Sequence, residues 1–274
     1  PVRVFQRFAT LDLISNGRAE IVAGRGSFTE AFPLFGLRLE QYDELFTENL
    51  VLLLELRKTN PITWVSKVRA PLNNQGVYPR PLQNPLPIWL GAGGTPESFA
   101  RAGSLGLPLM VAIIGGDFGR FRPHVNLYRQ AGARAGYSPK ELKVGVHAFG
   151  YVAETSEEAR DIFYPGFAHM MGEIGKERGW PPMTREQFEG SCSLRGANFV
   201  GDPNDIIEKI LYQHEIFGHQ RLLLMFTVGT MSHKKVMHAI ELLGTKVAPV
   251  VRSEIARRRA TDIEATAKST GGVT

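Results

Sequence analysis

The sequence predicts an α/β fold, and three observations support this prediction. Short apolar runs alternate with segments of helical periodicity along the 274 residues. The apolar runs are continuous, which is typical of parallel strands buried on both faces. Several of them end in turns rich in glycine or small residues, namely GRGS, GAGGT, IIGG and VGT. The length fits either two modest domains or one large α/β barrel of about 250 residues.

In the first half of the chain, turn residues mark where the elements end. Ser15-Asn16-Gly17 stops the first helix, and Pro96 takes the favoured first position of a later one. Prolines and an Asn-Asn-Gln-Gly sequence indicate a hairpin-like insertion at about 60–83. The predicted helices cover residues 4–14, 40–57 and 96–104, and the predicted strands cover residues 19–23, 88–90 and 109–114.

In the second half, the alternation continues around another insertion at about 171–197, where the segment 179–197 is irregular. Pro165 marks a candidate kink in a long helix. Without a linker, we expect one barrel domain over residues 1–259 and a disordered tail over 260–274. The predicted helices cover residues 122–135, 156–178, 203–217 and 233–243, and the predicted strands cover residues 142–152 and 221–226.

The composition excludes several classes of protein. With 43% hydrophobic and 22% charged residues, it argues against a disordered, collagen-like or coiled-coil chain. The net charge of +5 is concentrated near the C-terminus, which is a weak signal for nucleic acid. The single cysteine, Cys192, excludes an internal disulfide and a thiolate-built zinc site, and there is no metal motif. No signal peptide or membrane span is visible, so we expect a cytoplasmic protein with neither membrane nor nucleic-acid partner.

The turn Gly91–Thr95 is the first candidate site. Its glycines let the backbone approach a phosphate, and the free N–H groups of the following helix point toward it. Thr95 fits as the N-cap of that helix or as a hydrogen-bond donor to the phosphate. The spacing matches neither the dinucleotide fingerprint nor the P-loop. Glycines also serve tight turns without any ligand, so this turn alone is a weak signal.

Arg25, flanked by Gly24 and Gly26, is the second candidate. Its guanidinium would match a phosphate bidentately, but a surface salt bridge explains it equally well. Ligands of parallel α/β folds collect at the carboxyl ends of the strands, where these turns lie. Taken together, the turns favour an anionic ligand.

The other reactive side chains carry less information. His147 is interpreted as a hydrogen-bonded core histidine rather than one at a barrel mouth, and His214 and His219 do not share a helix face well. His233 either contacts a ligand or begins the last helix, and Cys192 is interpreted as inert. Three methionines are interpreted as core residues: Met170, Met171 and Met225.

Four segments occur in consistent order between Pro1 and about Arg252: FATLDLISNGRAEIVAGRGS, AFPLFG, PRPLQNPLPIWLGAGGTPESFARAGSLGLPLM and FVGDP. Together they resemble the bacterial luciferase-like monooxygenase family. The resemblance implies a TIM (β/α)8-type barrel that holds reduced FMN or, in a sister branch, the deazaflavin F420. The cofactor performs the redox chemistry, and the protein binds it, orients it and excludes water.

The resemblance also implies which residues bind the cofactor. Arg25 matches the arginine that contacts the flavin phosphate. Gly24 stands where luciferase has a reactive cysteine, so thiol chemistry is not implied. A second phosphate-binding arginine, near Tyr42 and Asp43, has no counterpart here. The positions that match cofactor-binding stretches are Gly24, Arg25, Gly26, Ala92, Gly93, Gly94 and Thr95.

The first three or so βα units of the family, with a histidine implicated in catalysis, have no counterpart in the sequence. We therefore expect an incomplete barrel, completed in the natural protein by further N-terminal sequence, and assign no catalytic residue. The expected function is FMN-dependent oxidation of a small organic substrate with O2, by a homodimer supplied by a separate flavin reductase. The alternatives are an F420-dependent oxidoreductase that transfers hydride and a non-catalytic flavin-binding protein.

Overall fold

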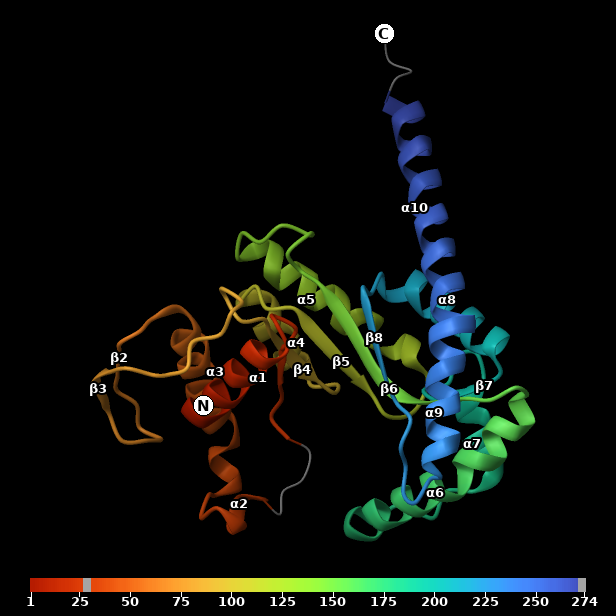
Figure 1. Cartoon of the computed structure of the whole chain (residues 1–274), viewed down its shortest axis with the longest axis horizontal. Helices are drawn as coiled ribbons and strands as arrows, with labels where there is room; N and C mark the ends of the chain where they lie inside the picture. Colours follow the sequence, from red (N-terminus) through yellow and green to blue (C-terminus); the bar gives the residue numbers. More distant parts are fainter. Residues whose placement is uncertain (27–30, 271–274) are drawn as a thin grey trace. The chain divides into compact units, whose positions relative to one another are not determined.

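The computed structural model describes residues 1–26 and 31–270 (Figure 1). Parallel strands alternate with helices, so the predicted α/β class is confirmed. The chain forms two compact units. The first comprises residues 1–110 and 128–143, and the second comprises residues 111–127 and the described residues from 144 onward. None of the described helices combines the length and apolar character required to span a membrane.

The first unit contains the strands whose ends carry the candidate turns. Strand β1 pairs in parallel with β4, with Ile21 opposite Ile88 and Ala23 opposite Leu90. Strand β5 follows next to β4, and Leu90 N of β4 donates to Pro108 O, just before β5, at 2.8 Å. The strands are β1 (Ile21–Ala23), β4 (Ile88–Ala92) and the start of β5 (Leu109–Ile113). The helices are α1 (Val2–Ile14), α2 (Ala31–Leu34), η1 (Leu39–Gln41), α3 (Tyr42–Lys58), α4 (Pro96–Ser104) and the second half of α5 (Arg122–Arg134).

The first predicted insertion is a hairpin. Strands β2 (Ile62–Trp64) and β3 (Leu72–Gln75) pair antiparallel, with Ile62 opposite Gln75 (Figure 1). The hairpin therefore interrupts the parallel alternation, as the prolines and turn residues of this segment indicated.

A buried carboxylate fixes the start of β1. Asp12, on α1, is fully buried, and its oxygens accept hydrogen bonds from Gln83 N at 2.8 Å, Gln83 Nε2 at 2.7 Å and Ala19 N at 3.2 Å. Burial alone would raise the pKa of Asp12, but these hydrogen bonds outweigh it and lower the pKa. The side chain of Gln83 also donates to Ala19 O at 2.7 Å. The carboxylate thus joins α1, the segment before β1 and the segment before β4.

The second unit is built around the long strand β6. β8 pairs in parallel with its first half, with Gly145 opposite Arg221, and β7 pairs in parallel with its last residues, with Gly150 opposite Phe199. The strands are β6 (Val144–Val152), β7 (Phe199–Gly201), β8 (Arg221–Met225) and the end of β5. The helices are η2 (Phe118–Phe121), the first half of α5, α6 (Ser156–Arg178), α7 (Arg185–Cys192), α8 (Pro203–Phe217), α9 (His233–Leu242), η3 (Leu243–Val247) and α10 (Ala248–Thr270).

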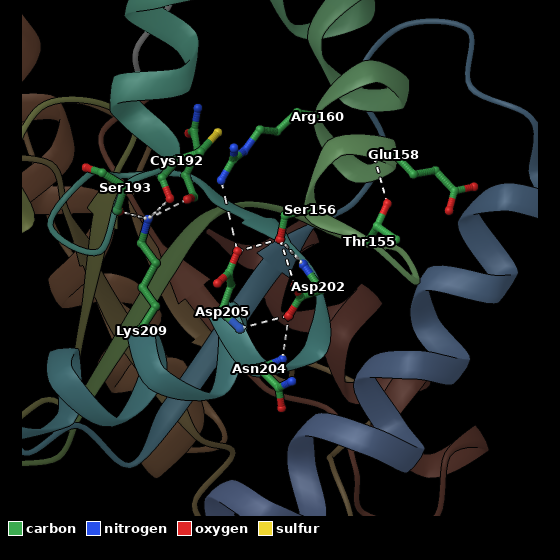
Figure 2. Close-up of polar contacts among 11 residues, drawn as sticks. Thr155, Ser156, Glu158, Arg160, Cys192, Ser193, Asp202, Asn204, Asp205 and Lys209 are labelled. Atoms are coloured by element: carbon green, nitrogen blue, oxygen red, sulfur yellow. Dashed lines mark hydrogen bonds and ion pairs between the residues drawn. The ribbon is translucent and has the colours of Figure 1, made fainter.

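A buried lysine holds the turn between α7 and β7 (Figure 2). Lys209, on α8, is 2% exposed, and its ammonium donates to Ser193 O at 2.6 Å, Asn198 O at 2.6 Å and Cys192 O at 3.3 Å. Burial lowers the pKa of Lys209 to about 7, whereas the three carbonyl groups favour its charged form. The lysine thereby satisfies carbonyl groups at the C-terminal end of α7, which have no partner within that helix.

A second polar cluster joins the starts of α6 and α8, as Figure 2 shows. Ser156 Oγ donates to Asp202 Oδ2 at 3.0 Å or to Asp205 Oδ2 at 2.5 Å, and it accepts from Asp202 N at 2.9 Å. Asp202 is the N-cap of α8 and accepts from Asn204 N and Asp205 N. Carboxylates at these helix starts are favoured by the helix dipoles.

Three elements of the second unit differ from the sequence predictions. Helix α7 lies within the segment predicted to be irregular, and a capping box between Thr184 and Gln187 begins it. Phe199–Gly201 form a short strand, although this segment was treated as a lead into the next helix. Helix α10 runs from Ala248 to Thr270 and so extends into the segment 260–274 that was expected to be a tail (Figure 1). Residues 271–274 lie outside the described residues.

A pair of histidines lies where α8 ends. Gly218, with φ of 59°, terminates the helix, and the ring of His219 then meets the ring of His214 edge-on at 5.4 Å. His214 Nδ1 also lies 2.9 Å from His219 O. Burial, and secondarily the neighbouring His214, lower the pKa of His219 to about 4. His219 is therefore neutral in the folded protein at neutral pH.

We expect Asp12→Ala to lower the free energy of unfolding by about 3 kcal/mol, because it leaves the main-chain N–H groups of Gln83 and Ala19 without their acceptor and removes one of the two acceptors of Gln83 Nε2. Urea unfolding measures this change. A cycle with Gln83→Ala separates the shared interaction from the two side chains. Additive effects of the two substitutions would contradict the proposed coupling.

His219 is expected to make the protein sensitive to acid. Its folded pKa of about 4 lies below the value of about 6.5 in an unfolded chain, so the unfolded state binds more protons between these pH values. Stability should therefore fall by about 3 kcal/mol from this source as the pH drops from 6.5 to 4. Urea unfolding across this range should show a weaker pH dependence in His219→Gln. The same substitution at the exposed His233 is the matched control and should leave the dependence unchanged.

Candidate functional site

The two candidate turns meet through one pair of side chains in the first unit. Arg25 follows β1, and Thr95 lies between the end of β4 and the start of α4. Arg25 Nη2 donates to Thr95 Oγ1 at 3.0 Å. Because β1 and β4 are parallel neighbours, their carboxyl ends lie side by side, and residues 70 positions apart come into contact. The structure thus brings together the two turns that the sequence singled out separately.

Helix α3 supplies two more contacts to Arg25 at its first two residues. Asp43 Oδ1 accepts from Arg25 Nη1 at 2.7 Å, and the guanidinium carbon lies 4.9 Å from the centre of the Tyr42 ring. The Tyr42 hydroxyl donates to Gly26 O at 2.6 Å, which fixes the backbone just after Arg25. The arginine side chain is consequently held on three sides and is 19% exposed.

The backbone around these side chains is open and conformationally special. A Cβ atom added at Gly24 or Gly93 would have no described heavy atom within 4 Å, apart from its chain neighbours. Gly26 has φ of 78° and Gly94 has φ of 132°, and residues other than glycine rarely adopt these backbone angles. A ligand group could therefore approach the backbone at either turn closely.

Thr95 occupies the N-cap position of α4, but its hydroxyl makes no capping hydrogen bond to the helix. Instead the hydroxyl accepts from Arg25, and Thr95 O accepts from Ser98 N at 3.0 Å. The start of α4 carries partial positive charge. Beside it lies a full positive charge on Arg25, and the combination suits an anion.

The predicted cofactor-binding residues lie together at this site. Gly24 and Gly26 flank Arg25, Ala92 is the buried last residue of β4, and Gly93 and Gly94 lead from it to Thr95. Their role in binding a cofactor stays a prediction. The contacts of Tyr42 and Asp43 with this turn were not predicted from the sequence, where these residues only mark the place of an absent arginine. Ser27, in the same turn, lies outside the described residues.

The other candidate residues, including His147, His233 and Cys192, belong to the second unit. His147, on β6, is half-buried, burial lowers its pKa, and within the described chain its ring has no hydrogen bond. The hydrogen bond predicted for it is therefore not found. His233 is exposed at the start of α9, and Cys192 is 7% exposed with a pKa that burial raises to about 11, as expected of an inert thiol.

Two of the three methionines predicted to be core residues are confirmed, and one is not. Met170 and Met171 pack against the hydrophobic core of the second unit, as predicted. Met225, at the end of β8, is 37% exposed, so its interpretation as a core residue is wrong. Among the described residues, no group of three or more potential ligands is placed to hold a metal ion.

Solved structures with the same fold include flavin and deazaflavin enzymes. The monooxygenase RslO1 from Streptomyces bottropensis matches with a TM-score of 0.75 and 21% identity, over 91% of this chain and 74% of that one. An F420-dependent secondary alcohol dehydrogenase has a TM-score of 0.68 and 18% identity, over 92% and 75%. A type II Baeyer–Villiger monooxygenase from Pseudomonas putida, in complex with FMN, has a TM-score of 0.68 and 20% identity, over 91% and 75%. The predicted incomplete TIM-type barrel is confirmed.

Curated proteins are similar at the level of sequence. An uncharacterized protein, y4vJ, from Sinorhizobium fredii is 22% identical over 95% of this chain and 76% of its own length. The FMNH2-dependent dimethylsulfone monooxygenase of Pseudomonas fluorescens is 23% identical over 92% of this chain and 70% of its own length.

The family assignment follows from a match to a whole family rather than to one relative. Residues 1–220 match the family described as luciferase-like monooxygenase. This segment contains both candidate turns, the Asp12–Gln83 pair and the contacts of Arg25. The chain belongs to the luciferase-like monooxygenase family.

Proposed function

We propose that the protein is a flavin-dependent monooxygenase that uses reduced FMN and O2 to oxidise a small organic substrate. The observation that carries this proposal is the contact between Arg25 and Thr95 beside the start of α4. A guanidinium, a hydroxyl and a helix N-terminus together suit the terminal phosphate of FMN. The FMNH2 dependence of the dimethylsulfone monooxygenase and the FMN complex of the Baeyer–Villiger enzyme support this choice of cofactor.

The residues present fit such a cofactor. No described heavy atom lies where a Cβ at Gly24 or Gly93 would be, apart from their chain neighbours, so among the described residues a phosphate or the flavin edge can approach the main chain there. In this proposal Arg25 binds the phosphate, Thr95 orients it through its hydroxyl, and the Tyr42 hydroxyl keeps the Arg25 turn in place. Reduced FMN, when bound, supplies the electrons that activate O2 for oxygenation. No residue of the described chain is assigned a catalytic role.

The F420-dependent alternative rests on the same site. Arg25 is a single cation, and the carboxylate of Asp43 already offsets part of its charge. Such a site also suits the singly charged phosphodiester of F420, and an F420-dependent dehydrogenase shares the fold. Titration of the purified protein with FMN and F420 separates these proposals. Saturable binding of F420 without binding of FMN would replace the first proposal by the second.

Measuring O2 consumption distinguishes a monooxygenase from a protein that only binds flavin. The protein is supplied with FMN, a separate flavin reductase and NAD(P)H as the electron donor, and O2 uptake is measured with and without candidate substrates such as dimethyl sulfone. Product formation above the substrate-free background supports the monooxygenase. Flavin binding without product from any substrate favours the non-catalytic alternative. A reductase partner, a homodimer and a cytoplasmic location belong to the same proposal.

Arg25→Ala is expected to weaken FMN binding by about 1.5–3 kcal/mol, because it removes a charge-assisted contact to the phosphate. Riboflavin, which lacks the phosphate, should bind equally well to both proteins. Quenching of flavin fluorescence measures the two affinities. Arg38→Ala, at an exposed position of the same unit, is the matched control and should leave both unchanged. Equal FMN affinity of wild type and Arg25→Ala would reduce Arg25 to a structural ion pair.

A further inference from the structure

The guanidinium of Arg25 is shared between a neutral partner and an anionic one. Arg25 Nη2 donates a hydrogen bond to Thr95 Oγ1 at 3.0 Å, and Arg25 Nη1 donates to Asp43 Oδ1 at 2.7 Å. The two partners reach Arg25 from different elements, since Thr95 precedes α4 whereas Asp43 is in the first turn of α3. A phosphate that binds Arg25 therefore meets a carboxylate already bound to one of the nitrogens it would use.

The side chains of Asp43 and Arg25 differ in their exposure to solvent and in how many contacts hold them. The side chain of Asp43 is 71% exposed, whereas that of Arg25 is 19% exposed and also lies on the Tyr42 ring. An exposed carboxylate can turn into water at little cost, because exposed ion pairs contribute little to stability. Arg25 is held in place by Tyr42 and Thr95 when that happens. The ion pair can thus open on the side of Asp43 while the cation stays where it is.

Charge decides which ligands this carboxylate disfavours. Electrostatic repulsion between Asp43 and a bound phosphate scales with the charge of the phosphate. At neutral pH a phosphate monoester carries almost two negative charges, and a phosphodiester carries one. An uncharged flavin that lacks the phosphate feels no such repulsion. The ranking of ligands is therefore set by the ionic state of the phosphate.

We propose that Asp43 is a specificity-determining residue that competes with the phosphate group of the cofactor for Arg25. It lowers the affinity of the site for a phosphate monoester more than for a phosphodiester, and it keeps Arg25 oriented when no phosphate is bound. This inference rests on the proposed function, in which Arg25 binds the cofactor phosphate. In this role the carboxylate of Asp43 weakens the binding of the phosphate, whereas a second arginine at this place would strengthen it.

The test compares wild type with Asp43→Asn, which keeps the shape of the side chain and removes its charge. Dissociation constants for FMN, F420 and riboflavin are measured by fluorescence quenching or calorimetry at low ionic strength. We expect FMN to bind about 5-fold more tightly to the variant, F420 about 2-fold more tightly and riboflavin equally well. Added salt should reduce the difference for FMN, because the repulsion is screened.

Glu44→Gln is the matched control, because Glu44 is the other acidic residue in the first turn of α3 and is exposed. An equal gain in FMN affinity for Glu44→Gln and Asp43→Asn would overturn the inference in favour of a general charge effect. An unchanged FMN affinity in Asp43→Asn also overturns it, and the proposed function then still stands if wild type binds FMN and Arg25→Ala binds it more weakly. If wild type binds neither FMN nor F420, the proposed function and this inference both fail.

Discussion

The candidate site depends on a carboxylate that is shielded from solvent. Asp12 is fully buried, and it accepts hydrogen bonds from the main chain and side chain of Gln83 and from the main chain of Ala19. Gln83 precedes β4 and Ala19 precedes β1, so one charged group sets where both strands begin. Because β1 and β4 are short and parallel, fixing their starts also fixes where they end. The contact between Arg25 and Thr95 is a consequence of that register.

Most of the elements could be predicted from local sequence, and the reason is physical. Continuous apolar runs mark strands buried on both faces, and turn residues mark the ends of helices such as α1 and α4. The rule that ligands gather at the carboxyl ends of parallel strands then placed Arg25 and Thr95 in one region before their contact was known. The LDLISNGR and PLQ segments, which carried part of the family resemblance, contain Asp12 and Gln83, and the structure shows that these two residues are bonded to each other.

The remaining features depend on partners that are distant in the chain. Nothing adjacent to Asp43 indicates that its carboxylate meets Arg25, which is 18 residues earlier and on another element. The same holds for His219, whose low pKa arises from burial that the local sequence does not reveal. Helix α7 is a different case, because the Thr184–Gln187 spacing of its capping box is a local pattern that could have predicted where the helix begins. Helix α10 was not predicted, although residues such as Glu254 and Arg257 are spaced to form ion pairs on one face of a helix, and the structure shows this pair.

The way in which Lys209 is bound has a consequence for how the second unit can diverge among relatives. Its three acceptors are main-chain carbonyl oxygens, which every amino acid provides. Side chains at positions 192, 193 and 198 can therefore be exchanged without removing an acceptor, provided that the backbone path is kept. An insertion or deletion between Cys192 and Asn198 would instead move at least one carbonyl away from the ammonium. This turn should consequently vary in sequence while its length is conserved.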